Sequence, residues 1–247
     1  MIAAPLFGWA NAAFGFRWTM GGLALALLLS GLAAVVLLNL SGATLPRRVG
    51  RGASGDHRHG AIFVRLFILF FVAAAAGLTV LSQAAGIIVS YGGTTAMALA
   101  ATTAMAGGIA VARLSGGWLT DRFPVPYVGA FAQGFALTGA ILLTLWPHPL
   151  VAAVALGMVG MGYGFISGCT AAAVALYWPL ADYGRIASRI YIAWCVAALS
   201  LPILAGHLFD LTGRYETAVI IAGCGNLVGV IVALGLPRPG TAFMQAA

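Results

Sequence analysis

The chain has 247 residues, of which 62% are hydrophobic and only 7% are charged, with a mean hydropathy of +1.03. Soluble domains carry about 25% charged residues, so this composition excludes a soluble globular domain, a disordered chain and a disulfide scaffold. All 12 basic residues are arginine, and the absence of lysine excludes Schiff-base chemistry of the retinal-receptor kind. The class that remains is an all-α membrane protein. A span needs about 20 apolar residues, so the chain holds roughly six to eight helices.

The apolar segments follow one another along the whole chain. Residues 1–14 form a stub that spans only some 20 Å at about 1.5 Å per residue, which is too short to cross a hydrocarbon core near 30 Å. Seven segments are long enough to cross: residues 18–40, 62–90, 94–119, 125–146, 150–177, 186–208 and 217–236. Pro202 interrupts the sixth of these and predicts a kink there.

Residues 41–61 form the longest polar stretch and the natural boundary between two unequal parts, 1–40 and 62–247. His57 and His59 in this stretch could indicate a metal-binding tract. A solvated run of charge is favoured instead, because no cysteine or third nearby ligand accompanies them. The stretch is therefore expected to be a loop, and no metal or cofactor is expected.

The arginines are distributed unevenly between the two sides of the membrane. With alternating loops, ten of them fall on the side of loop 41–61, and only Arg17 and Arg214 fall on the other. The positive-inside rule then places loop 41–61 and the C-terminus in the cytoplasm of a cell with an inner membrane. Nucleic acid is not expected as a partner, because no patch of interleaved aromatic and basic residues accompanies the positive charge.

Arg113 is the one ionisable residue well inside a span. A charge at membrane depth costs roughly 2.5–3.5 kcal/mol on insertion scales, so it is a functional candidate by default. The alternative is that its side chain extends to the headgroups as one more cytoplasmic arginine. Helical spacing places Thr95, Thr102 and Ala106 on the same face as Arg113.

Three further spans carry a polar or aromatic stripe. Their members are Thr79, Ser82, Gln83, Gly86 and Ser90; Tyr163, Ser167 and Thr170; and Tyr191 with Trp194. Each stripe could simply connect neighbouring helices by hydrogen bonds. Several such stripes around a single cation favour a shared aqueous cavity that receives an anion. Gly160, Gly164 and Gly168 form a small-residue ladder, which lets two helix backbones approach closely.

Residues 116–122, with the sequence GGWLTDR, resemble the cytoplasmic loop motif of the major facilitator superfamily between helices 8 and 9. Residues 70–83, 111–116, 189–198 and 202–215 are similar to the oxalate/formate antiporter branch and its monocarboxylate-porter relatives. The resemblance implies that residues 1–40 are part of helix 5 and helix 6 at the end of an N-terminal half. Residues 41–61 are then the cytoplasmic loop between the halves, and residues 62–247 are the C-terminal six-helix bundle.

The resemblance also implies site residues. Arg113 takes the place of the helix 8 arginine that holds a substrate carboxylate, and Tyr163, Tyr191 and Trp194 supply the aromatic lining, with Gln83 as a further lining residue. Trp194 stands where oxalate exchangers carry a second cation, which favours a monocarboxylate over a dicarboxylate. Gly117, Asp121 and Arg122 are the expected gating residues of the loop motif.

These observations predict a secondary active transporter, or a fragment of one, that moves small organic anions by alternating access, through exchange or proton symport. Its other partners are the lipid bilayer and an N-terminal half that this sequence lacks. The alternatives are a non-transporting truncated membrane protein and a facilitator of a different metabolite. An enzyme is not expected, because the spans hold no cluster of acids, histidines and an activated nucleophile.

Overall fold

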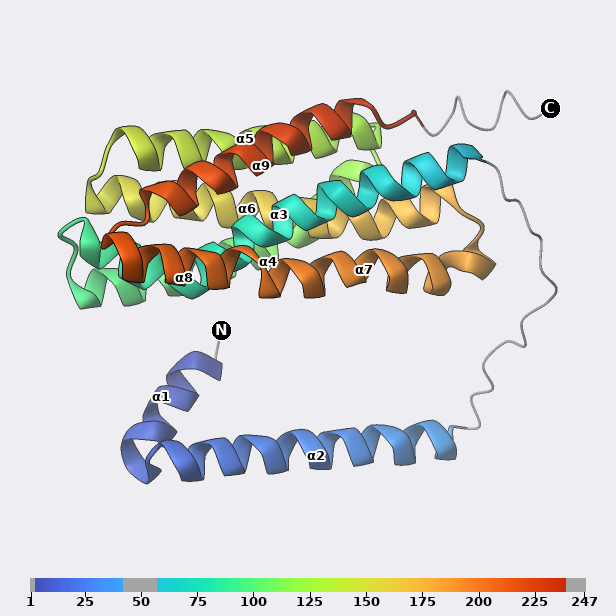
Figure 1. Ribbon diagram of the computed structural model, residues 1–247. Helices are drawn as coiled ribbons and strands as arrows, with labels where there is room; N and C mark the ends of the chain where they lie inside the picture. Colours follow the sequence, from blue (N-terminus) through green and yellow to red (C-terminus); the bar gives the residue numbers. More distant parts are fainter. Residues whose placement is uncertain (1–2, 42–56, 239–247) are drawn as a thin grey trace. The chain divides into compact units, whose positions relative to one another are not determined.

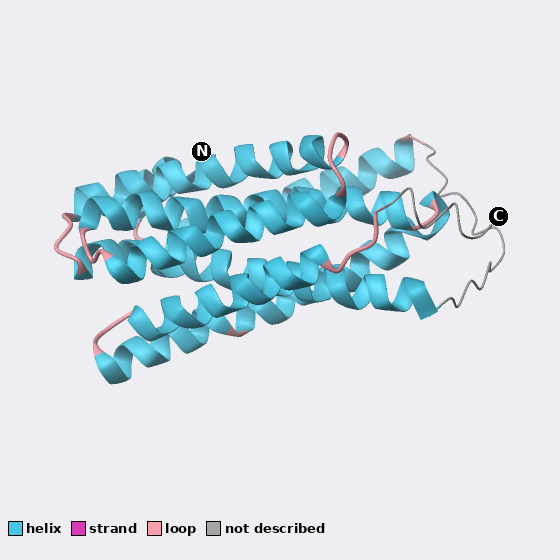
Figure 2. Ribbon diagram, turned by 90° about the horizontal axis from the view of Figure 1, so that it is seen from above, coloured by secondary structure: helices cyan, strands magenta, loops and turns pink. Residues whose placement is uncertain are grey.

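A computed structural model of the chain describes residues 3–41 and 57–238. Over these two stretches the chain consists of helices joined by short loops, with no strand (Figure 2). The chain divides into two compact units, Met1–Ala53 and Ser54–Ala247. Most of the expected loop, residues 42–56, lies outside the described residues.

The described part of the first unit, residues 3–41, contains two helices. α1 spans Ala3–Phe14 and α2 spans Phe16–Leu40. Gly15 separates them with a φ of +77°, a left-handed conformation that glycine adopts without a steric penalty. The Gly15 carbonyl accepts from the Thr19 backbone N–H at 3.1 Å and from the Thr19 hydroxyl at 3.0 Å.

The described part of the second unit, residues 57–238, is a bundle of six membrane spans. Its helices are α3 (His57–Ser90), α4 (Thr95–Thr120), α5 (Val125–Leu145), α6 (Pro149–Tyr177), α7 (Tyr183–Leu199), α8 (Leu201–Thr212) and α9 (Glu216–Leu234). With α2, the described residues hold seven helical segments long and apolar enough to cross a membrane, which confirms the seven expected spans and the all-α membrane class. α7 and α8, together with a short 3₁₀ turn before α7, make up one of these spans.

The start of α3 differs from the expectation. The helix begins at His57 rather than at residue 62, so the last residues of the expected loop are helical. The His59 ring lies 6.1 Å from the ring of Trp178, and this contact supports an additional turn at the start of the helix.

The expected kink in the sixth complete span is confirmed and amounts to a break. α7 ends at Leu199, and Ser200 has a φ of −98° and a ψ of −92°, outside the helical region. Pro202 explains the break, because it has no N–H to donate to the preceding turn and its ring clashes with that turn.

The spans of the bundle form three layers (Figure 1). α3 and α6 make the middle layer, α5 and α9 pack together on one side of it, and α4 and α7–α8 lie on the other. The two middle helices are the most buried spans of the bundle, whereas α4 and α7–α8 are the least buried. The layer of α4 and α7–α8 is therefore the least covered by the rest of the bundle, and it carries Arg113.

Candidate functional site

The Tyr163 hydroxyl joins three helices at the middle of the bundle. Tyr163 is the central residue of α6, about 21 Å from each end of that helix, and only 4% of it is exposed. Its hydroxyl oxygen accepts from Arg113 Nη2 on α4 at 3.3 Å and from Trp194 Nε1 on α7 at 2.9 Å. The structure thus brings together three of the five residues expected to bind substrate.

Glycines hold α4 and α6 close enough for this contact. A Cβ atom added at Gly168 would lie 2.0 Å from the Arg113 carbonyl oxygen, and one at Gly164 would lie 2.6 Å from the Ile109 carbonyl oxygen. No larger residue fits at these two positions without moving the backbone. The expected role of the glycine ladder, close approach of two helix backbones, is therefore confirmed for α6 against α4.

Gly77 of α3 plays the same part on the other side of Tyr163, and sequence reasoning missed it. A Cβ atom there would lie 2.4 Å from Tyr163 Cβ, so the tyrosine packs directly on the α3 backbone. Gly77 follows a run of four alanines, residues 73–76, which gave no periodic signal of a contact with α6.

The Arg113 side chain extends toward the middle of the spans. Its Cα lies about 10 Å from the end of α4 at Thr120, yet its guanidinium bonds Tyr163 at mid-span. Helical side chains lean toward the N-terminus of their helix, and for α4 this direction leads away from the nearer end. The guanidinium carbon also lies 5.7 Å from the centroid of the Tyr163 ring, within the range of a cation–π contact.

The hydrogen bonding at Tyr163 leaves one donor available. A phenolic oxygen accepts through its lone pairs and donates through a single O–H. Because Arg113 and Trp194 both donate to this oxygen, the hydroxyl hydrogen is free to point at a further acceptor. A carboxylate near the Arg113 guanidinium would offer such an acceptor.

Tyr191 and Gln83 have other partners. The Tyr191 ring packs edge-on against Phe70 at 5.1 Å, one helical turn from Trp194 along α7. Gln83 accepts from the Tyr215 hydroxyl at 3.2 Å, and it lies six residues beyond Gly77 on α3, about 9 Å along the helix. Tyr191 therefore lies beside Trp194 and contributes its ring to the aromatic lining. Gln83 belongs to a separate contact near the end of α3.

Most hydroxyls in the polar stripes bond within their own helices. Thr79, Ser82, Ser90 and Thr102 each donate to a carbonyl three or four residues earlier. This geometry satisfies the hydroxyl without connecting helices. These residues can thus line a polar surface, but they do not provide the interhelical hydrogen bonds considered from the sequence.

The loop-motif residues lie at the end of α4. The Arg122 guanidinium stacks over the Trp118 ring at 3.9 Å from its centroid, and Asp121 is the C-cap residue of α4. An added Cβ at Gly117 would meet nothing within 4 Å, so Gly117 leaves open space on the exposed side of the helix. Within residues 3–41 and 57–238, no group of three metal-ligating side chains comes together.

Comparison with curated proteins relates the chain to monocarboxylate transporters. It is 34% identical over 135 residues to monocarboxylate transporter 13 of Bos taurus, covering 52% of this chain and 30% of that protein. It is 33% identical over 162 residues to monocarboxylate transporter 11 of Homo sapiens, covering 60% of this chain and 33% of that protein. The chain thus spans about a third of the length of the curated relatives it matches. No family model matches the chain.

Comparison with solved structures identifies the fold. A bacterial homologue of the human lysosomal transporter Spinster, inward-facing and occupied, aligns with a TM-score of 0.54 and 13% identity over 94% of this chain and 62% of that one. The inward-facing, unoccupied structure aligns with a TM-score of 0.55 and 14% identity over 94% and 63%. Together, the comparisons confirm the resemblance to major facilitator transporters and their monocarboxylate-porter relatives.

Proposed function

We propose that this multi-pass membrane chain, a relative of the monocarboxylate transporters with a major facilitator fold, is part of a secondary transporter that moves monocarboxylates by alternating access. The Arg113 guanidinium binds the carboxylate, and the Tyr163 hydroxyl donates a second hydrogen bond to it. The observation that carries the proposal is the hydrogen-bonded set of Arg113, Tyr163 and Trp194 at the middle of the bundle.

The chemistry of the three side chains suits a small organic anion. A guanidinium pairs with a carboxylate through two parallel N–H bonds, and such charge-assisted bonds are roughly twice as strong as neutral ones. Trp194 holds the Tyr163 oxygen from the other side and therefore keeps the phenol in place when the anion binds. One cation with two neutral partners matches a single negative charge better than two, which favours a monocarboxylate.

The exposure of the site supports a second helical bundle opposite it. Arg113 is exposed on the layer of α4 and α7–α8, and 37% of Trp194 is also exposed. An arginine that faces hydrocarbon costs roughly 2.5–3.5 kcal/mol, so we propose that a second bundle and the water between the two cover this face. The bundle would come from the rest of a longer protein, from a partner or from a second copy. The substrate then lies between two bundles that rock against each other, as in transporters built from two structural repeats.

Binding and uptake test the proposal separately. Addition of lactate to the purified chain is expected to change the intrinsic tryptophan fluorescence, to which Trp194 contributes, and Arg113→Gln is expected to abolish the change. Arg185→Gln is the matched control, because Arg185 forms an exposed ion pair with Asp182 at 3.2 Å near the start of α7, roughly 13 Å along the helix from Trp194. An unchanged lactate response in Arg113→Gln contradicts the site. Lactate binding without uptake in proteoliposomes, even with the second bundle supplied, contradicts transport and favours the non-transporting alternative.

A further inference from the structure

An apolar groove of about 280 Å³ runs along the outer layer of the bundle, on the side opposite to Arg113. It lies between α5 and α9, and Leu137, Ile141, Ile220 and Leu227 are among its walls. Roughly half of each of Ile141, Ile220 and Leu227 is exposed, so the groove opens outward from the bundle. The function proposed above makes no use of this feature.

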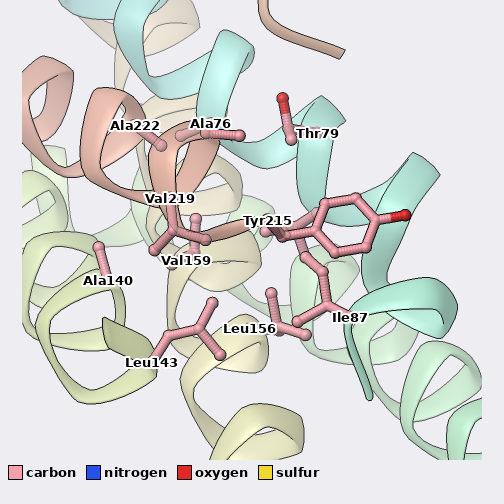
Figure 3. Close-up of a pocket in the computed structure, with 12 residues that line it drawn as sticks. Ala76, Thr79, Ile87, Ala140, Leu143, Leu156, Val159, Tyr215, Val219 and Ala222 are labelled. Carbon is pink, nitrogen blue, oxygen red and sulfur yellow. The ribbon is translucent and has the colours of Figure 1, made fainter. Parts of the chain in front are cut away.

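Small residues create the groove. Gly223 of α9 faces α5, and a Cβ atom added there would reach Ala140 at 3.4 Å, an ordinary contact distance. Ala140 and Val219 line both the groove and a second apolar cavity of about 20 Å³ behind it (Figure 3). The Thr144 hydroxyl in the wall donates to the Ala140 carbonyl at 2.9 Å, so it presents no unpaired donor to an apolar occupant.

The dimensions of the groove match one leaflet of a bilayer. On each helix its lining residues fall within nine positions, 137–145 and 219–227, which is about 12 Å along the helix axis. The groove begins at the end of α5 and near the start of α9, at the membrane surface. A hydrocarbon core is about 30 Å thick, so a groove of this length takes the upper part of one acyl chain aligned with the helices.

Opposite charges lie above the groove. Glu216 is the first residue of α9 and lies on the same helical face as Ile220, Gly223 and Leu227, at i, i+4, i+7 and i+11. Arg214 lies beside it, with 3.9 Å between Arg214 Nη1 and Glu216 Oε2, and both side chains are more than half exposed. A loose exposed ion pair of this kind contributes little to stability and leaves both charges able to bind other groups.

We propose that the groove holds one acyl chain of a phospholipid whose headgroup carries both a phosphate and an amine. The phosphate pairs with Arg214, the ammonium group pairs with Glu216, and the acyl chain lies along Gly223. Asp210, the other acid near this end, adds negative charge and disfavours a headgroup that carries only a phosphate. The lipid belongs to the leaflet on the side of the α8–α9 turn.

The test measures phospholipid retained per chain after exhaustive washing in detergent, by extraction and mass spectrometry. The chain is loaded beforehand with an equal mixture of phosphatidylethanolamine and phosphatidylglycerol. The wild type is expected to keep about one phosphatidylethanolamine more than Gly223→Leu, which fills the groove from its floor. Ile220→Trp fills the groove from its exposed rim, where the larger side chain does not enter the packed interior of the bundle. This variant is expected to lose the same lipid. Ile231→Phe, an exposed position on α9 outside the groove, is expected to behave like the wild type.

Headgroup variants test the second half of the proposal. Glu216→Gln removes the partner of the ammonium group and is expected to lower the preference for phosphatidylethanolamine over phosphatidylglycerol by about two- to fivefold, the range of one exposed ion pair. Arg214→Gln removes the partner of the phosphate that both lipids carry and is expected to lower the retention of both. Equal lipid retention in the wild type, Gly223→Leu and Ile220→Trp would overturn the proposal. A wild-type dimer that becomes a monomer in both groove variants would also overturn it, because a second copy would then occupy the groove.

Discussion

At the scale of single residues, Tyr163 packs into the bundle through its ring and contacts the proposed substrate-binding residues through its hydroxyl. Its ring is enclosed by α3 and α4 while its hydroxyl is reached by two donors from different helices. Two donors on one oxygen orient the phenol strongly, and one of them carries a full positive charge. The residue can therefore hold Arg113 in place before an anion arrives, and such preorganisation reduces the ordering cost of binding.

Tyr163→Phe is expected to weaken monocarboxylate binding by about tenfold. The substitution removes one charge-assisted hydrogen bond, which contributes about 1.5–3 kcal/mol, and it leaves the Trp194 N–H without its acceptor. Binding is measured by lactate titration of the purified chain. Tyr191→Phe is the control, since the known contact of Tyr191 is through its ring, and it is expected to change affinity by less than about twofold. Equal losses in the two variants would show that the Tyr163 hydroxyl has no special part.

Tyr215 offers a pH-dependent test of the contact with α3. Burial, with a smaller contribution from the charge of Asp210, raises the pKa of Tyr215 above its usual 10.0. The neutral phenol donates to Gln83 at 3.2 Å, and a phenolate could not. This stabilisation is therefore complete below pH 10, the pKa in the unfolded chain, and is lost as the pH rises through the higher pKa of the folded state.

Tyr215→Phe is accordingly expected to lower the free energy of unfolding by about 1 kcal/mol at pH 8. The deficit relative to wild type should disappear at pH values above the pKa of the folded chain. Thermal unfolding of both proteins in detergent between pH 8 and 11.5 measures it. Both proteins keep the ring stack on Phe209 at 4.2 Å, so a deficit that stays constant over this range would mean that the hydrogen bond from the neutral Tyr215 phenol to Gln83 is not its source.

At the scale of the elements, the contact between α4 and α6 determines where Arg113 lies. The backbone of α4 passes so close to Gly164 and Gly168 that the position of Arg113 follows from the glycine ladder. In a membrane, van der Waals packing of this kind replaces much of the hydrophobic driving force between helices. The ladder is therefore both a structural contact and the support of the site.

Gly168→Ala is expected to destabilise the bundle by about 1–3 kcal/mol, the usual cost of overpacking. The added methyl group would lie 2.0 Å from a backbone oxygen that cannot move aside alone. Gly157→Ala on the same helix is the control, because its nearest neighbour is Met105 Cγ at 4.0 Å. Thermal unfolding of the two variants gives the comparison. If they unfold at the same temperature, the close approach of α4 and α6 is not a source of stability.

The elements themselves could be predicted from the sequence because each is long, apolar and ended by recognisable residues. The break before α8 was expected from Pro202, and a close helix contact along α6 was expected from glycine spacing, although its partner α4 was not. The start of α3 was expected at residue 62 and lies at His57. Residues 57–61 gave no sign of the ring contact between His59 and Trp178. A contact between distant parts of the chain is not encoded in the local pattern.

The candidate site was predictable only in part for the same reason. Arg113 was identified because a charge at membrane depth is energetically costly. Tyr163 and Trp194 were identified by their helical spacing and by the resemblance to the facilitator family. Their shared hydrogen-bond acceptor required the tertiary structure. Gln83 was grouped with them because the polar residues of its span recur with the period of a helix. Its hydrogen-bond partner is instead Tyr215, on the turn before α9. Helical periodicity indicates which face a residue lies on and not its height relative to neighbouring helices.

At the scale of the whole molecule, we propose that loop 41–61 and the C-terminus face the cytoplasm of a cell with an inner membrane. The ends of α4 and α9 carry Arg122 and Arg238, whereas the opposite end of α9 carries Arg214. Positive charge on one side of a polytopic protein favours retention of that side in the cytoplasm. The same orientation follows from the resemblance to the facilitator loop motif.

Cysteine accessibility tests this orientation in intact cells. Phe123→Cys, at the α4–α5 turn, and Ser90→Cys, at the end of α3, are introduced after Cys195 and Cys224 have been changed to serine. A membrane-impermeant maleimide is expected to label Ser90→Cys in intact cells and to label Phe123→Cys only after permeabilisation. The reverse pattern would invert the proposed topology.

The most direct test of the whole account compares a monocarboxylate with its neutral amide. Lactate and lactamide differ in the charge that Arg113 is proposed to recognise, while their sizes are nearly the same. We expect the wild type to bind lactate at least about tenfold more tightly, as a charge-assisted pair implies, and Arg113→Gln to bind the two almost equally. If Arg113→Gln keeps the wild-type preference for lactate over lactamide, Arg113 does not hold the carboxylate and the proposed function is wrong.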